Sequence, residues 1–488
     1  MQQRSSRTRR GLGWSVACVL LAGCQVPAKT AGSERTTQSG STKSDRTSVS
    51  VTVYNQNFGV VRDTRRLPLG AGRVELSFKD VSSQIQPETV RLHSLTKGAL
   101  FEVLEQNYRY DLLTPAKLLE KYVGKQIAVY RYNERTGSEE KKVAELLGVE
   151  GGVTLRIDGE VTTNFRGRYA FADVPANLLD EPTLVWLLRS DRSEQDVEVT
   201  YLTRNLNWRA DYVLKLDDSD TRADLNGWVT LDNRTGTSYE NAALRLVAGD
   251  VNRVQPPPSP EAVAYEAARD ADAADGRQFK EEGLFEYHLY SLDRPTSLLN
   301  NETKQVALLS AEGVAVSKKL VFDSAPYFYR GQHGQLAQNQ KLGVFIELSN
   351  SDKNRLGMPL PQGTVRLYKA DASGALQFVG EDAIEHTPRD EQVSLKVGEA
   401  FDVIGDRKQT EWAQLDKCSV EAAFEVELRN HKDTGVSVEM NEPVGGDWQV
   451  QKSSHPFVKI DAGTFRFDVK VPPRQTVKVA YRVRVRYC

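Results

Sequence analysis

One polar loop in the C-terminal third of the chain gathers side chains that can do acid–base chemistry. It places a histidine among five carboxylates and an arginine, and its candidate site residues are Glu381, Asp382, His386 and Asp390. A hydrolase acting on envelope polysaccharide or peptide can use such a set, with a carboxylate as general base and the histidine as acid. We favour the alternative of a polar loop that leads into a strand, because nothing in the spacing fixes how these groups face one another. The sequence therefore assigns no catalytic residue.

No spacing in the sequence predicts a metal site or a cofactor. The six histidines fall in none of the zinc-ligand patterns, and there is no CxxC pair. A group of aspartates at Asp217, Asp218, Asp220 and Asp224 lacks the spacing of a calcium loop, and a hairpin turn explains it more simply. Nucleophile-elbow, Walker and dinucleotide-binding motifs are also missing from the sequence. The sequence thus favours a protein that is not an enzyme.

The N-terminus carries the residues of an export and lipidation signal. Four arginines precede an apolar stretch, residues 11–22, that is too short for a bilayer span of about 20 residues. The stretch ends in Leu-Ala-Gly-Cys24, which resembles the lipobox of bacterial lipoproteins. By that resemblance residues 1–23 are a signal peptide, and Cys24 becomes the lipidated first residue of the mature chain. The alternative is an ordinary secreted protein with a chance cysteine.

The residues after the lipobox indicate where the protein lies. Gln25 follows Cys24, and in lipoproteins of enteric-type bacteria this resembles an outer-membrane sorting signal. We therefore expect a lipid anchor in the cell envelope, at the periplasmic face of the outer membrane. Residues 24–48 contain almost no bulky apolar side chain, so we predict a disordered tether. A flexible chain of this length spans roughly 25–30 Å, which keeps the folded body near the membrane.

Two cysteines remain in the mature chain, Cys418 and Cys488. In an oxidising compartment they can form a disulfide that closes a long loop and contributes about 4 kcal/mol. The alternative is two free thiols. The strand predicted after Cys418 carries glutamates on its polar face, and the strand predicted before Cys488 carries lysine and arginine. Opposite charges favour pairing across strands, so we predict that these two strands are antiparallel neighbours.

The charge pattern also suggests a register for this pair. We place Glu421 opposite Arg486 and Glu425 opposite Arg482. In that register Cys488 lies opposite Ser419, so the two thiols point to opposite faces of the sheet. A disulfide would then require the chain end to twist.

Apolar residues alternate with a period of two along most of the body, with turn clusters between the runs. About 440 residues follow the tether, which is too long for one core. We predict a mainly β, multi-domain fold with immunoglobulin-like β-sandwiches, a small β-barrel insert in the N-terminal region and few short helices. The predicted parts are an N-terminal β region (49–111 with 166–189), the barrel insert (112–165), a β-sandwich with a Pro-rich or helical insertion (190–360, insertion 255–280) and a C-terminal β-sandwich (361–488).

Three stretches carry a resemblance to a known family. They are YLTRNLNWRADYVLKLDD from Tyr201, LPQGTVRLYKADASGALQFVGEDAIEH, and ELRNHKDTGVSVEM near the C-terminus. They resemble the bacterial family called domain of unknown function 4139, over most of residues 190–488. Some members, called mucoidy-inhibitor-like, carry a long coiled coil where this chain has its small β insert. The resemblance implies a β-rich envelope protein and brings no catalytic residues.

Charge and composition limit the classes of partner that the protein can bind. The chain has 64 Lys and Arg against 66 Asp and Glu, and removing the four signal arginines leaves 60 against 66. This slight acidic excess gives no support to nucleic-acid binding. We expect a lipid-anchored protein that binds or scaffolds envelope proteins or polysaccharide without catalysis, with the hydrolase as the alternative. Convergent titratable groups would favour the hydrolase, whereas an exposed apolar patch or an open sheet edge would favour the scaffold.

Overall fold

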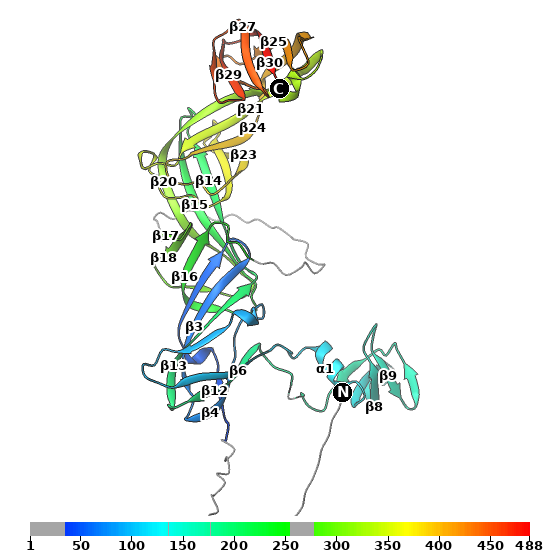
Figure 1. Ribbon diagram of the computed structural model, residues 1–488. Coiled ribbons are helices and arrows are strands. Elements are labelled where there is room, and N and C mark those ends of the chain that lie inside the picture. The colour runs from blue at the N-terminus through cyan, green and yellow to red at the C-terminus, as the bar shows by residue number, and fades with distance from the viewer. Residues whose placement is uncertain (1–34, 135, 176, 254–277) are drawn as a thin grey trace, which may run out of the picture.

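The computed structural model describes residues 35–134, 136–175, 177–253 and 278–488, and it consists almost entirely of strands (Figure 1). The prediction of a mainly β protein with several sheets is confirmed. The predicted signal peptide, Cys24 and most of the Pro-rich or helical insertion predicted at 255–280 lie outside the described residues. Within the described ranges, no helix is long and apolar enough to cross a membrane.

Two sheets form the N-terminal sandwich. One has the order β1-β4-β12-β6, and the other has the order β17-β18-β16-β2-β3-β13-β5, with β19 paired to β16. Side chains of both sheets, such as Val61 and Trp186, belong to one buried cluster. The strands of the first sheet are β1 (Thr37–Ser41), β4 (Gly72–Phe78), β12 (Thr183–Ser190) and β6 (Phe101–Arg109). Those of the second are β17 (Phe279–Leu284), β18 (Tyr287–Leu292), β16 (Tyr239–Ala248), β2 (Arg46–Tyr54), β3 (Phe58–Pro68), β13 (Glu194–Arg204), β5 (Arg91–Ser94) and β19 (Thr296–Leu298).

The prediction of a disordered tether over residues 24–48 is wrong for its second half. Strand β1 pairs in parallel with β4, and β2 begins at Arg46. Ser41 is buried, and its hydroxyl accepts a hydrogen bond from Arg65 Nη1 at 3.2 Å. An edge strand is held by backbone hydrogen bonds, so it forms without the bulky side chains that the composition argument requires.

The insert in the N-terminal region is an open sheet, so the prediction of a small β-barrel is wrong. Its strand order is β10-β9-β8-β7-β11, and the end strands β10 and β11 do not pair with each other. Its last strand ends at Ala170, beyond the predicted boundary at 165. The elements are α1 (Pro115–Tyr122), β7 (Gln126–Asn133), β8 (Ser138–Gly148), β9 (Thr154–Ile157), β10 (Glu160–Thr162) and β11 (Arg168–Ala170).

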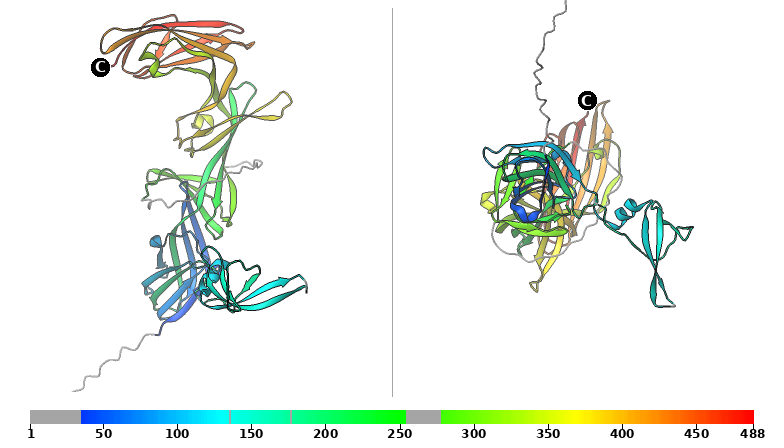
Figure 2. Two further views of the ribbon diagram at one scale, coloured as in Figure 1. Left: turned by 90° about the vertical axis from the view of Figure 1, so that its right-hand side faces the viewer. Right: turned by 90° about the horizontal axis from the view of Figure 1, so that it is seen from below.

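The insert has its own small core and stands apart from the rest of the molecule (Figure 2). Helix α1 begins at Pro115, because the Thr114 side chain accepts a hydrogen bond from the Lys117 N–H and proline follows the cap. The chain enters and leaves the insert side by side. The Leu113 N–H donates to the Leu179 carbonyl oxygen at 2.7 Å, and the Leu179 N–H donates to that of Asp111 at 2.9 Å.

The middle and C-terminal sandwiches share one strand path, β23-β22-β14-β15-β20-β21-β24-β25-β30-β27, with β26, β28 and β29 attached at the C-terminal end. The strands of the middle part are β14 (Leu206–Leu216), β15 (Arg222–Asn233), β20 (Glu302–Asp323), β21 (Gln335–Ser349), β22 (Gly363–Ala370), β23 (Leu376–Ile384) and β24 (Gln392–Gln414). Those confined to the C-terminal part are β25 (Ser419–Asn430), β26 (Val436–Pro443), β27 (Asp447–Ser453), β28 (Phe457–Lys459), β29 (Thr464–Val471) and β30 (Thr476–Arg486).

Two long strands run from the middle sandwich into the C-terminal one. Strand β20 has 22 residues and β24 has 23. Val306 of β20 lies in the larger core, which the middle and N-terminal sandwiches share, whereas Phe322 of the same strand lies in the C-terminal core. Strand β24 is shared in the same way, because Leu395 lies in the larger core and Val403 lies in the C-terminal core. The sandwiches therefore follow one another in an elongated molecule (Figures 1 and 2).

The sheets cross the domain boundaries that we predicted at residues 190 and 361. Strands β13, β16, β17 and β18 complete the N-terminal sheet, and β22 with β23 completes the middle one. Two parallel pairs make these connections, β2 with β16 and β14 with β22. Alternation along one strand shows that it is a strand but carries no mark of a distant partner, so the predicted boundaries followed chain order instead.

Candidate functional site

The four residues predicted as a polar site do not converge. Glu381 on β23 forms an ion pair with Arg366, whose Nε lies 3.2 Å from Glu381 Oε2. The carboxylate of Asp382 accepts a hydrogen bond from the Lys396 N–H at 2.7 Å, which fastens β23 to β24. Asp390 is an exposed turn residue with a positive φ of 67°, and its N–H donates to the Asn350 carbonyl oxygen.

His386 links the N-terminal sandwich to the middle one. Its Nδ1 accepts a hydrogen bond from the Gln362 N–H at 3.1 Å, so a neutral ring carries its proton on Nε2. That nitrogen lies 3.1 Å from Asn55 Nδ2, and the buried Asn55 Oδ1 lacks a partner. With the Asn55 amide turned by 180°, Oδ1 would instead accept from Nε2–H.

The electrostatics around His386 favour its neutral form. Burial lowers the pKa of His386 below its ordinary value, and the neighbouring His288 acts in the same direction. The Asp250 and Glu385 carboxylates oppose this shift, but they do not reverse it. A neutral histidine that is hydrogen-bonded on both ring nitrogens holds two sandwiches together, and it has no free nitrogen to offer a substrate.

Metal binding finds no support in the described ranges, where no group of three or more His, Cys, Asp or Glu side chains is arranged to hold an ion. Asp217, Asp218 and Asp220 lie in the turn between β14 and β15, whereas Asp224 lies in β15 opposite Lys215. Asp217 Oδ1 accepts the N–H groups of Thr221 at 2.9 Å and Arg222 at 3.1 Å. Hydrogen bonds from the Ser219 hydroxyl and these amides lower the pKa of Asp217 to about 2.

Sequence reasoning missed a buried ion pair in the C-terminal core. Arg407 Nη1 lies 2.7 and 2.8 Å from the two carboxylate oxygens of Glu442, and both side chains are almost fully buried. Tyr329 donates to Glu442 at 2.8 Å, and Arg407 donates to the Tyr481 hydroxyl at 2.9 Å. A signal for this cluster exists, because Arg407 and Glu442 occupy inward-facing positions of β24 and β26. Opposite charges in the inward phase of two strands indicate such a pair.

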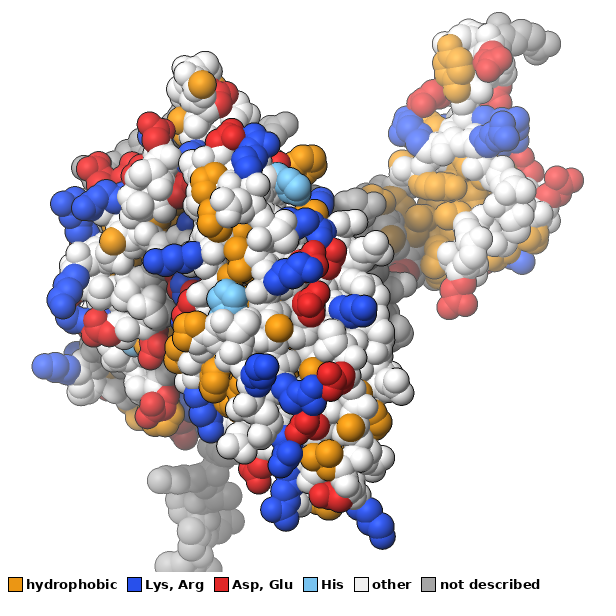
Figure 3. All heavy atoms as spheres, turned by 90° about the horizontal axis from the view of Figure 1, so that it is seen from above, with side chains coloured by type: hydrophobic (Ala, Val, Ile, Leu, Met, Phe, Trp, Pro, Cys, Tyr) orange, Lys and Arg blue, Asp and Glu red, His pale blue; other side chains and the backbone are white. Residues whose placement is uncertain are grey.

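The aromatic residues at 327–329 do not form one exposed face. Tyr327 is 60% exposed, whereas Phe328 and Tyr329 are buried in the C-terminal core. The insert exposes other apolar side chains, among them Tyr132, Val143 and Val161. Figure 3 shows hydrophobic side chains on the outlying insert as well as on the main body.

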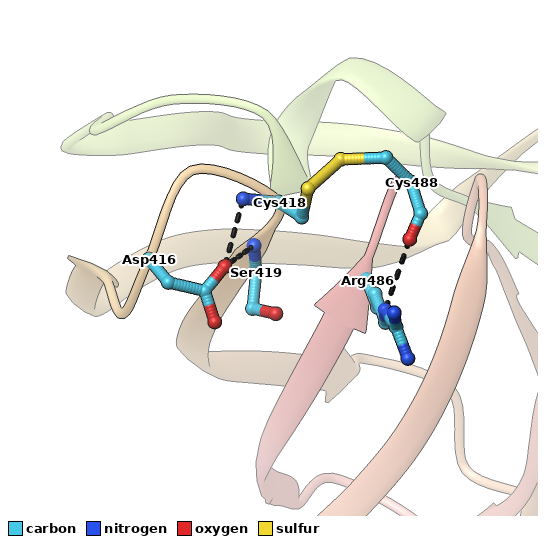
Figure 4. Close-up of a disulfide and its surroundings, with 5 residues drawn as sticks. All are labelled: Asp416, Cys418, Ser419, Arg486 and Cys488. Atoms are coloured by element: carbon cyan, nitrogen blue, oxygen red, sulfur yellow. Dashed lines mark hydrogen bonds between the residues drawn. A yellow bond between two sulfur atoms is a disulfide. The ribbon is translucent and has the colours of Figure 1, made fainter.

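A disulfide joins Cys418 and Cys488, whose Cα atoms are 5.3 Å apart (Figure 4). Strands β25 and β30 are antiparallel neighbours as predicted. The predicted register is wrong by two residues, because Glu421 lies opposite Arg484. Glu421 binds both Arg482 and Arg484, each at 3.0 Å. A slip of two residues keeps every side chain on its own face, so the hydrophobic pattern could not exclude it.

A turn brings the two cysteines together despite their opposite strand phase. The Asp416 carboxylate accepts the N–H groups of Cys418 at 2.7 Å and Ser419 at 2.8 Å (Figure 4). These bonds hold Cys418 just before the ladder begins at Ser419. The Tyr487 N–H donates to the Cys418 carbonyl oxygen at 2.8 Å, so the chain end follows the turn.

A family model described as domain of unknown function (DUF4139) matches residues 197–488. The chain belongs to this family. The DUF4139 region holds the middle and C-terminal sandwiches together with β16, β17, β18 and most of β13, which complete the N-terminal sheet. A search of curated proteins finds no match to this chain.

Proposed function

We propose that this DUF4139 protein is a lipid-anchored scaffold of the cell envelope, which holds binding surfaces at a set distance from the membrane without catalysis. The observation that supports this proposal most directly is that β20 and β24 pass through both the middle and the C-terminal cores. Strands shared by two cores resist bending at the junction, unlike a flexible linker between independent domains. A rigid elongated body suits a spacer or scaffold.

The scattered polar residues support the non-catalytic alternative over the hydrolase. A hydrolase needs an acid and a base that face the same substrate bond. Here Glu381 binds Arg366, Asp382 binds the β24 backbone, and both ring nitrogens of His386 are used. Their contacts are with different partners, so these groups do not face one substrate bond.

The lipid anchor in this proposal is Cys24. Thirteen residue steps separate Cys24 from Thr37, the first residue of β1, and a chain of that length reaches at most about 45 Å. The N-terminal sandwich would then stay close to the outer membrane, while the C-terminal sandwich extends toward its partners. Envelope proteins or polysaccharide are the proposed partners.

The experiment is a pull-down from crosslinked envelopes that compares the wild-type chain with Cys24→Ala. The matched control is Cys18→Ala, which changes a cysteine inside the predicted signal. We expect the same partners with wild type and Cys18→Ala, and their loss with Cys24→Ala. Equal capture by Cys24→Ala would reject the role of the anchor. Release of polysaccharide or peptide fragments by the purified chain would reject the non-catalytic role.

A further inference from the structure

The sheet of the middle sandwich curls until its two end strands meet. Strands β23 and β24 end the order β23-β22-β14-β15-β20-β21-β24, and a carboxylate rather than a backbone ladder fastens one to the other, from Asp382 to the Lys396 N–H. Next to this bond the strands touch, since a β-carbon at Gly380 would lie 2.1 Å from the Val397 carbonyl oxygen. We call the line between β23 and β24 the seam.

A bulge in each strand opens the seam beyond Gly380. The register between β22 and β23 shifts so that Val379 has no opposite residue. The register between β21 and β24 shifts so that Val397 has none. A bulge bends its strand and strengthens the local twist, and two bulges that face each other splay the strands apart.

A pocket of about 240 Å³ lies where the seam opens. Its apolar lining comes from five aliphatic side chains, Leu216, Val344, Ile346, Val379 and Val397. Its charged groups balance, because Asp220 binds Lys318 at 2.7 Å and Lys369 at 2.5 Å, and Glu399 adds a second carboxylate. With no net charge in the lining, the pocket suits an apolar group.

Among the described residues, the edges of the open seam lack strand partners, and the start of β23 is uncharged, whereas the β24 edge carries Glu399 and Asp402. In the described part of the chain, β23 pairs only with β22, and β24 pairs only with β21 before Val403. Leu376 and Phe378 are 53% and 55% exposed, and Phe401 is 83% exposed. The first four residues of β23 carry no charge, whereas edge strand β6 carries Glu102, Glu105 and Arg109. Charges on an edge discourage strand pairing, so the uncharged start of β23 is more open to pairing than β6 is.

We propose that the seam binds an extended peptide segment of a partner protein by strand addition, with one apolar side chain anchored in the pocket. Backbone groups without strand partners on β23 and β24, apart from the Asp402 carbonyl oxygen that accepts from the His431 N–H, match the donors and acceptors of a peptide strand. The pocket is smaller than the roughly 300–1,000 Å³ of sites for whole small-molecule ligands, so it takes one side chain of a longer partner. This inference rests on the proposed binding function and gives it a site.

The test uses nonapeptides of alternating threonine and serine with one central guest residue: leucine, phenylalanine or lysine. Amide hydrogen exchange of the purified full chain is measured at residues 376–380 and 398–402. We expect the leucine and phenylalanine peptides to slow exchange at both edges by about tenfold or more, and the lysine peptide to leave it unchanged. No slowing by any peptide, or equal slowing by the lysine peptide, would overturn the proposal.

Two variants separate the pocket from general effects. Val379→Asp puts a carboxylate in the pocket wall at a position that is 40% exposed, so it should fold. Val458→Asp makes the same change on the edge strand β28, at a position that is 51% exposed. Peptide protection should vanish in Val379→Asp and persist in Val458→Asp, and protection that persists in both would overturn the proposal.

Two further outcomes would assign the seam to another occupant and so overturn the proposal. If protection from hydrogen exchange rises with protein concentration in the absence of peptide, a second copy of this chain occupies the seam. Protection by decanoate and by none of the peptides would mean an acyl chain. If peptides bind but the anchored pull-down fails, only the envelope scaffold is rejected. If the pull-down succeeds without peptide binding, only the seam is rejected.

Discussion

Arg407 and Glu442 form a two-oxygen ion pair inside the C-terminal core, where each side chain is at most 1% exposed. Arg407 also lies over the rings of Phe322 at 5.2 Å and Phe328 at 5.8 Å. The pair thereby connects η3 (Pro326–Tyr329) with β20, β24 and β26. It sits at the place where the two long strands enter the C-terminal sandwich.

Removing one partner of this pair should destabilise the protein strongly. Glu442→Leu leaves the Arg407 charge buried without a counter-ion, and such changes cost about 3–5 kcal/mol. The double variant Arg407→Met/Glu442→Leu should recover much of that loss, because it removes both charges. Urea unfolding of the two variants measures this. A single variant within about 1 kcal/mol of wild type would contradict the prediction.

Buried tyrosines predict a loss of stability at alkaline pH. Burial raises the pKa of Tyr108 and of Tyr239 to about 12, and it raises the pKa of Tyr329 and Tyr481 well above 10. Above pH 10 the unfolded chain releases these phenolic protons while the folded chain keeps them. The free energy of unfolding should therefore be unaffected by these groups below pH 10 and should fall between pH 10 and 12. Urea unfolding across this range tests it, and an unchanged stability at pH 11.5 would contradict it.

The disulfide should stabilise the C-terminal sandwich mainly through the unfolded state. Its cysteines are 70 residues apart, and closing such a loop contributes about 4 kcal/mol in the chain-entropy model. The Cys418→Ala/Cys488→Ala variant should lose up to that amount while keeping its strands. Denaturant unfolding of the variant, and of wild type with and without reductant, measures the effect. Equal unfolding midpoints for the variant and for wild type with and without reductant would argue against a stabilising role of the disulfide.

The insert should be dispensable for folding of the rest. Its core is separate, and the chain enters and leaves it through the Leu113 and Leu179 hydrogen bonds. Replacing residues 114–178 by a short Gly-Ser linker should leave the melting temperature of the main body nearly unchanged. A melting temperature that falls by more than about 5 °C, the shift expected for roughly 1–2 kcal/mol, would show that the insert supports the sandwich.

The DUF4139 region alone should fold poorly, in contrast to the chain without its insert. Residues 197–488 include β16 but lack β2, its parallel partner, so the buried Leu244 and Leu246 would lose their neighbours Val51 and Val53. This fragment also lacks β3, the antiparallel partner of β13. Limited proteolysis of this fragment should remove β13 and β16 first. A protease-resistant fragment with all its strands intact would refute the prediction.

Local patterns in the sequence predicted single strands well and their distant partners poorly. The alternation around Phe424 and Val483 identified β25 and β30 and their pairing, yet left a two-residue slip open. Strand β1 escaped notice because an edge strand of Thr, Gln, Ser and Gly has no apolar pattern. The parallel partnership of β2 with β16 leaves no trace in either strand.

The pocket at the seam could not be predicted from the sequence for a related reason. The seam pocket depends on two bulges, at Val379 and Val397, and both residues look like ordinary strand valines in the sequence. The polar loop around His386, in contrast, stood out by composition. Its side chains are used for contacts between β-strands and between sandwiches, and this role depends on neighbours such as Asn55 that are distant in the chain.

The most direct test of a rigid envelope scaffold is the distance between its two ends in solution. One spin label at Arg91 on β5 reports on the N-terminal sandwich, and one at Lys470 on β29 reports on the C-terminal sandwich; both residues are exposed. The control is a pair of labels at Gln451 and Lys470, which lie within one sandwich. Because β20 and β24 run through both cores, we predict one distance distribution that is nearly as narrow as that of the control pair. A broad or two-peaked distribution would show a hinge between the sandwiches and contradict the scaffold account.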